Sequence, residues 1–197
     1  MANYTRTGFG QVEPNHLSAQ RTAQIYAQLP AAADIEILEN GQFVKYDYAH
    51  VNESGEHRPE CNFDGEGEWM MVFNEVKLYD DFWKESYKDF AMKKENYTPG
   101  SDTITHNSLG PFRGQMTPRV IKINVGDIYT TNCLFQGNTS GKAVVTGTMP
   151  EVGDLMGPTK ASNGFLVKDG NEGVQFQVVK VYTMADTQPA VKLMRIK

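Results

Sequence analysis

The segment from residue 50 to residue 68 has the highest density of side chains that could bind a metal ion or transfer a proton. It contains two of the four histidines, one of the two cysteines and six acidic residues, with Arg58 as its one base. Zinc sites use paired Cys or His ligands at short spacing, and calcium loops use oxygen ligands at a fixed spacing around a glycine. The segment fits neither pattern, so we expect an acidic, solvent-exposed loop and assign no metal ligand. The side chains considered are His50, His57, Cys61, Asp64, Glu66 and Glu68.

The sequence contains no motif for nucleotide binding or nucleophilic catalysis. Gly137–Lys142 (GNTSGK) lacks the spacing of a phosphate-binding loop. Ser108 is not part of a Gly-x-Ser-x-Gly turn, and His106 near it has no acidic partner that the sequence identifies. We therefore assign no catalytic and no cofactor-binding residue, and the sequence favours assembly or binding over catalysis.

The 197 residues carry a formal charge of −5, which is unevenly distributed. Residues 1–100 contain 9 basic and 17 acidic side chains, whereas residues 101–197 contain 10 basic and 7 acidic. A direct nucleic-acid ligand is not expected, because such proteins normally have a pI above about 9, and the pI of this chain is about 5.4. No apolar run approaches the roughly 20 residues of a membrane helix, and the N-terminus does not resemble a secretory signal. We therefore expect a soluble protein made in the cytoplasm, with Cys61 and Cys133 reduced and buried.

The first 30 residues predict an extended arm followed by a short helix. The arm, residues 1–15, has no core of its own, so we expect either a disordered tail or a strap that becomes ordered on a neighbouring subunit. Three of its residues belong to types that are common at interface anchors, which favours the strap. These candidate partner-binding residues are Tyr4, Arg6 and Phe9. The helix is expected between its N-cap Asn15 and the stop at Pro30.

The central region, residues 31–117, predicts mixed α and β structure. Asn40-Gly41 lies between two alternating apolar runs and predicts a β-hairpin, and residues 69–73 predict a buried strand. Residues 79–97 fit both helical and strand spacing, and the helix is favoured because acidic residues precede it and lysines follow it. Residues 98–117 are rich in Pro and Gly and predict an irregular linker.

Residues 118–197 alternate between apolar and polar positions and predict strands. The sequence Val-Gly-Asp followed by an apolar residue occurs at 125–128 and again at 152–155, which predicts two equivalent turns that redirect strands. The expected fold is therefore mainly β with minor α. It comprises an N-terminal arm and short helix (1–30), a central α+β region (31–117) and a small C-terminal antiparallel β-barrel or sandwich (118–197).

Three stretches resemble a known class of proteins: Pro118–Asn132, residues 174–197 and FNEVKLYDD at residues 73–81. They resemble structural proteins that tailed phages encode beside their major capsid protein, and in particular capsid decoration, or head cement, proteins. The resemblance implies a non-enzymatic protein that binds the outer surface of the capsid as a dimer or trimer and stabilises the head. Its partner would be the major capsid protein, its location the outer capsid surface of the virion, and its place of synthesis the host cytoplasm.

The charge and the arm agree with this hypothesis. Proteins of the inner capsid wall face DNA and tend to be basic, so an acidic chain fits the outer surface. The acidic segment 50–68 either faces solvent or steers docking onto a basic patch of the capsid. We expect Tyr4, Arg6 and Phe9 to anchor the arm, and deletion of residues 1–15 to weaken capsid binding while the β region stays folded.

Two other functions remain open at this point. In a tail or host-adhesion protein, the C-terminal β region would bind a cell-surface glycan, with Trp69 and Trp83 as a stacking surface. In a cytoplasmic enzyme, an unrecognised site would lie around His50, His57 and Glu60.

Overall fold

A computed structural model describes eight ranges of the chain: 3–22, 24–26, 29–52, 54–74, 91–93, 116–135, 144–185 and 187–197. Across these ranges the protein is mainly β, with one short helix and antiparallel strands that form four sheets. None of the four closes into a barrel, so the C-terminal barrel that we expected is not found in the described ranges. These ranges also contain no helix that is long and apolar enough to cross a membrane.

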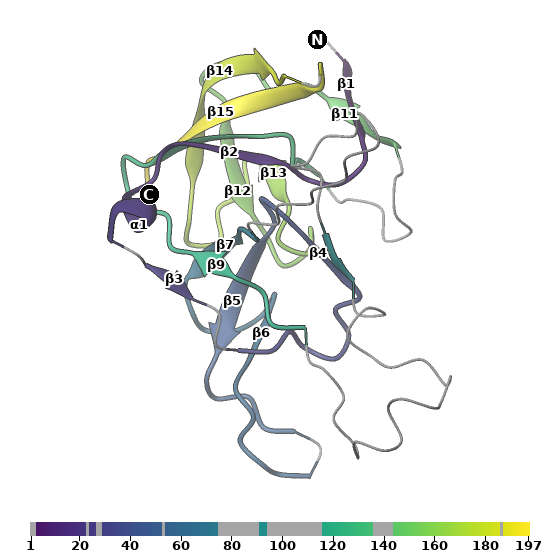
Figure 1. The fold of residues 1–197 in the computed structure, drawn as a ribbon, viewed down its shortest axis with the longest axis vertical. Helices are drawn as coiled ribbons and strands as arrows, with labels where there is room; N and C mark the ends of the chain where they lie inside the picture. The colour runs from purple at the N-terminus through teal and green to yellow at the C-terminus, as the bar shows by residue number, and fades with distance from the viewer. Residues whose placement is uncertain are drawn as a thin grey trace, which may run out of the picture.

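The largest sheet has six strands in the order β13-β12-β14-β15-β10-β2 and lies in the upper part of the molecule in Figure 1. Its strands are β13 (Leu166–Lys168), β12 (Leu155–Pro158), β14 (Phe176–Thr183), β15 (Pro189–Arg195), β10 (Ile128–Thr131) and β2 (Val12–His16). The edge strand β2 comes from the N-terminal arm and pairs with β10. The arm therefore belongs to the same sheet as the C-terminal strands, and the sheets do not follow the segment boundaries expected at residues 30 and 117.

The second sheet has five strands in the order β3-β9-β7-β5-β6 and is buried on both faces. Its strands are β3 (Ile25–Tyr26), β9 (Val120–Ile121), β7 (Trp69–Val72), β5 (Phe43–Asp47) and β6 (Glu60–Asn62). One face, with Phe43 and Trp69, shares a core with the six-stranded sheet, and the other face, with Val44 and Tyr46, packs into a second core. This two-sided burial explains the uninterrupted apolar run that predicted a buried strand at residues 69–73.

Two smaller sheets complete the described structure. Strand β1 (Asn3–Thr7) pairs with β11 (Val144–Thr148), and β4 (Ile37–Glu39) pairs with β8 (Ala91–Lys93). The helix that we expected over residues 79–97 is therefore wrong at β8, where pairing with β4 places Met92 against buried Leu38. The other residues of that segment, and residues 98–115 of the expected linker, lie outside the described ranges.

The hairpin expected at Asn40-Gly41 is wrong, although a turn is present. The strands on either side of the turn, β4 and β5, pair with β8 and β7 rather than with each other. Gly41 has a φ of 89°, and a Cβ atom there would lie 2.7 Å from the Cβ of Cys133. The turn passes the chain from one sheet to another at a close approach of two segments, which requires glycine.

The helix expected between Asn15 and Pro30 is shorter than the sequence predicted. Helix α1 spans Ser18–Thr22, and Ile25 already lies in β3, where it pairs with Ile121 of β9. A narrow apolar stripe stabilises a long helix poorly, whereas the pairing with β9 places Ile25 beside a fully buried partner.

The repeated Val-Gly-Asp segment forms two equivalent turns, as predicted. The amide of Asp127 donates to the carbonyl of Asn124, and the amide of Asp154 donates to the carbonyl of Glu151, both at 3.0 Å. Each aspartate carboxylate in turn accepts from the amide at the start of its own turn, at 2.8 and 2.9 Å. The turns lead into β10 and β12, which flank the central β14–β15 pair on its two sides.

Candidate functional site

The acidic surface expected near residue 50 is organised by the edge of the five-stranded sheet. Asp47, the last residue of β5, lies directly opposite Glu60, the first residue of β6. The amide of Asn62, two residues further along β6, donates to a carboxylate oxygen of each, at 3.5 Å to Asp47 Oδ2 and 3.3 Å to Glu60 Oε1. Like charges directly opposite each other destabilise an antiparallel pair. One amide thus holds together two carboxylates that would otherwise repel each other.

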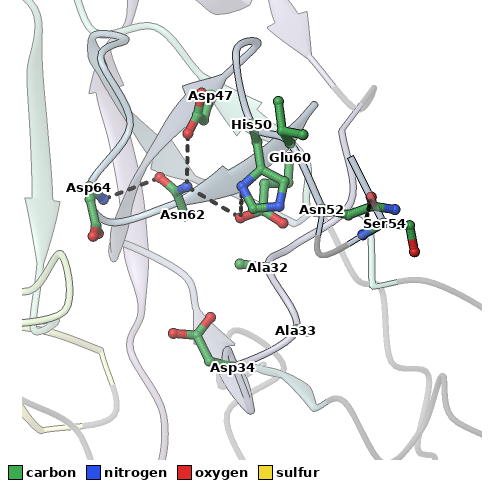
Figure 2. A pocket seen from close by; sticks show the side chains of 11 residues that line it. Ala32, Ala33, Asp34, Asp47, His50, Asn52, Ser54, Glu60, Asn62 and Asp64 are labelled. Carbon is green, nitrogen blue, oxygen red and sulfur yellow. Dashed lines mark hydrogen bonds and ion pairs between the residues drawn. The ribbon is translucent and has the colours of Figure 1, made fainter. Parts of the chain in front are cut away.

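These two carboxylates line an open pocket of about 740 Å³, shown in Figure 2. Asp34 and Asp64 contribute two further carboxylates, and the lining includes no lysine or arginine. The loop that carries Asp64 is fixed by Asn62 Oδ1, which accepts from the amides of Asp64 and Gly65. We name this feature the acidic pocket and define it by Asp34, Asp47, Glu60 and Asp64.

Carboxylates accept charge-assisted hydrogen bonds from ammonium and guanidinium groups, and they also coordinate metal ions. Among the described residues, no group of three or more His, Cys, Asp or Glu side chains is arranged to hold a metal. Lys160 already shows the alternative mode, because its ammonium lies 2.5 Å from Asp64 Oδ2 at the edge of the pocket. Of the other lining carboxylates, Glu60 is paired with His50 and has a side chain that is 17% exposed, and Asp47 is half-buried.

His50 and Glu60, which the enzyme alternative placed together, do meet in the acidic pocket. His50 Nδ1 lies 3.5 Å from Glu60 Oε1. Ser54 also lines the pocket, but Figure 2 shows its side chain beyond Asn52 and turned away from His50. A nucleophile and its base must lie within hydrogen-bond reach of each other. The arrangement therefore gives His50 a carboxylate partner but does not place a serine hydroxyl against it.

The remaining side chains considered as ligands do not converge on the pocket. Cys61 is buried in the second core, and burial raises the pKa of its thiol to about 12. Glu68 binds Lys122 and Arg195, at 2.8 and 2.7 Å. Burial alone would raise the pKa of Glu68, but the hydrogen bonds from these two cations lower it. His57 and Glu66 are exposed and do not line the pocket.

Two exposed apolar side chains lie on the loop that borders the acidic pocket. Tyr48 is 64% exposed and Val51 is 45% exposed. Val51 lines the pocket, and Tyr48 directly follows Asp47. Aromatic residues are enriched in protein interfaces, whereas acidic residues are depleted there.

A second charged surface lies on the outer face of the six-stranded sheet. Lys180 of β14 lies directly opposite Lys192 of β15, and their ammonium groups lie 5.8 and 5.9 Å from the ring centroid of Tyr182. Neither lysine forms an ion pair with any residue of the described ranges. By strand register Glu13 of β2 lies two strands from Lys192, with Thr130 of β10 between them. We call Lys180, Lys192 and Tyr182 the lysine pair surface.

The structure places the predicted anchor residues of the arm inside their own chain. Tyr4 and Arg6 on β1 are fully buried, and Phe9 is half-buried. The Tyr4 hydroxyl donates to the carbonyl of Asn132, and Arg6 Nη1 lies 2.7 Å from Glu39 Oε2. The premise that the arm cannot bury itself is therefore wrong. A partner role for these three residues stays a prediction, and deletion of residues 1–15 would remove part of the core.

The ion pair of Arg6 and Glu39 is closed off from solvent. Burial acts to lower the pKa of the Arg6 guanidinium, but Cys133 and Glu39 outweigh this effect and raise it. Glu39 Oε2 also accepts from the amide of Gly10, at 2.6 Å. The pair thus joins the arm to the turn after β4, and its role is structural.

Other residues singled out in the sequence have no surface role in the structure or fall outside the described ranges. Trp69 is buried, and Lys45 lies 4.9 Å above its ring, so Trp69 offers no free face to a glycan. Trp83, His106, Ser108 and the Gly137–Lys142 segment are not among the described residues. Sequence reasoning missed Asp34, Asp47 and the lysine pair surface, because their importance depends on strand register.

The chain matches no protein-family model, no curated protein and no solved structure.

Proposed function

We propose that this protein is a non-enzymatic capsid decoration protein, which binds the outer surface of the major capsid lattice of a tailed phage and stabilises the head. The proposal begins from the resemblance of Pro118–Asn132 and of residues 174–197 to proteins of that class. A protein that covers a lattice needs surfaces for binding at more than one place, because each copy contacts both the shell and its neighbours.

One observation carries the proposal: the chain has two charged surfaces of opposite sign on two different sheets. The acidic pocket lies at the edge of the five-stranded sheet, and the lysine pair surface lies on the six-stranded sheet. In each surface, side chains of like charge lie directly opposite each other, which costs stability in the isolated chain. A partner of opposite charge would remove that cost, and many copies on one shell would add their binding energies through avidity.

The test is binding to undecorated phage heads, measured by co-sedimentation of the purified full chain over a range of concentrations. We expect saturable binding in a fixed ratio to the major capsid protein, and a higher temperature of head disruption when the chain is bound. Charge complementarity predicts that binding weakens as salt increases. The absence of the chain from the head pellet at every salt concentration would contradict the proposal.

A further inference from the structure

We propose that the lysine pair surface of one copy binds the acidic pocket of a second copy. The contact is head-to-tail. On a phage head it would join neighbouring copies of the decoration layer, and this role rests on the proposed function. The contact itself is a property of the purified chain.

The acidic pocket supplies the negative side of this contact. Four carboxylates line it without a lysine or arginine among the lining residues, and one of them, Asp64, already binds a lysine ammonium of its own chain. Asp47 and Glu60 are held side by side by the amide of Asn62, so their positions are set before any partner arrives. Prior ordering of this kind lowers the entropic cost of binding.

The lysine pair surface supplies the positive side. Lys180 and Lys192 come from neighbouring strands and lie opposite each other, so they present two ammonium groups at close spacing. The acidic pocket presents Asp47 and Glu60 in the same way, from the neighbouring strands β5 and β6. Each surface is therefore a cross-strand pair of like charges, and the two pairs are opposite in sign and share the backbone spacing of neighbouring strands.

Apolar side chains near both charged surfaces agree with a second copy of the chain as the partner. Val51 lines the pocket and is exposed, the exposed Tyr48 directly follows Asp47 in the chain, and Tyr182 lies beside both lysines. An aromatic ring next to the charged groups adds buried apolar area to the contact, and aromatic residues are enriched in the centres of interfaces.

The positions of the two surfaces decide the type of assembly. Figure 1 shows the β14–β15 hairpin at the upper end of the molecule and the loops beyond β5 and β6 at the lower end. A contact between these different surfaces is heterologous, so each copy keeps one free surface after binding a neighbour. Such contacts form a ring when the rotation closes and an open chain when it does not. Both forms can extend over a repeating lattice.

The experiment uses sedimentation velocity of the purified full chain at two ionic strengths. The Debye length is about 30 Å at 0.01 M salt and about 3 Å at 1 M salt, so we expect oligomers at the lower and monomers at the higher ionic strength. Two variants reverse one surface each: Lys180→Glu with Lys192→Glu, and Asp47→Lys with Glu60→Lys. Each variant alone should associate at least tenfold more weakly than the wild type.

An equimolar mixture of the two variants is the decisive sample. Each surface of one variant then meets a surface of opposite charge on the other, so the mixture should form hetero-oligomers at low salt. This rescue also shows that both variants are folded. Control variants reverse the charge of an exposed residue outside both surfaces: Lys197→Glu and Glu151→Lys. These controls should associate like the wild type.

Three results would overturn the inference: a wild type that stays monomeric at low salt, a mixture that does not associate, or controls that lose association as strongly as the test variants. Binding to phage heads is scored separately with the same proteins. If the wild type binds heads but does not self-associate, the proposed function stands and the contact between copies is wrong. If it self-associates but does not bind heads, the contact stands and the decoration function is wrong.

Discussion

The buried pair of Arg6 and Glu39 differs from the like-charged pairs on the two surfaces in how its charges are balanced. Inside the molecule, a guanidinium and a carboxylate lie 2.7 Å apart with no access to solvent. On the surface, Asp47 faces Glu60 and Lys180 faces Lys192 across a pair of strands. Charges in the interior must be matched within the chain, whereas exposed charges can remain unmatched at small cost. The comparison separates residues that maintain the fold from residues that are available to a partner.

The largest expected effect comes from breaking the buried pair. Arg6→Ala leaves Glu39 buried without its cation, and we expect a loss of about 3–5 kcal/mol in the free energy of unfolding. Urea denaturation followed by circular dichroism measures the change. The double variant Arg6→Met with Glu39→Leu removes both charges and should recover most of the loss. A loss below about 1 kcal/mol for Arg6→Ala would show that the ion pair is not closed off from solvent.

The two equivalent turns allow the same substitution to be compared at a buried and at a more exposed aspartate, with a smaller expected loss of stability. Asp127 is buried and accepts from both the amide and the hydroxyl of Ser18 at the start of α1, at 3.0 and 2.5 Å. Asp154 occupies the same position in the second turn, and its partner outside the turn is the exposed Lys168, at 2.9 Å.

We expect Asp127→Ala to cost about 2–3 kcal/mol, because hydrogen bonds to a buried charged group are strong. Asp154→Ala should cost about 1 kcal/mol or less, because exposed ion pairs contribute little. Thermal unfolding of both variants in one buffer measures the difference. Equal losses would mean that the turn itself, rather than burial of the carboxylate, determines the effect.

The smallest effect is expected at the exposed like-charged pairs. Lys180→Gln removes one of two opposing like charges, so the free energy of unfolding should stay constant or rise by about 0.2–1 kcal/mol. The matched variant Lys197→Gln should change it less. A clear loss of stability in Lys180→Gln would show that the lysine pair surface serves the fold and is not held ready for a partner.

The sequence predicted the elements whose reasons are local and missed those that depend on pairing. Burial at residues 69–72 and the two Val-Gly-Asp turns follow from short stretches of sequence, and the structure confirms both. The Asn40-Gly41 hairpin failed because β5 finds its partners in β7 and β6, across long loops. The arm appeared to lack a core because its partners, β10 and β11, lie more than 100 residues away.

The residues of the acidic pocket and of the lysine pair surface also depend on strand pairing. The acidic segment 50–68, which predicted an exposed loop, contributes Glu60 and Asp64 to the acidic pocket, but Asp34 and Asp47 come from outside that segment. No local pattern shows that Lys180 lies opposite Lys192, because a bulge shifts the register between β14 and β15 just before that pair. Strand register therefore decides which charges meet, and register is set by the assembled sheets.

A density map of a whole phage head with the chain bound, at a resolution that separates β-sheets, is the decisive test of the proposed function. We expect copies on the outer surface of the shell, with the β14–β15 hairpin of one copy seated against the acidic pocket of the next. An outer surface without this chain, or density for it only in the tail, would show that it is not a capsid decoration protein.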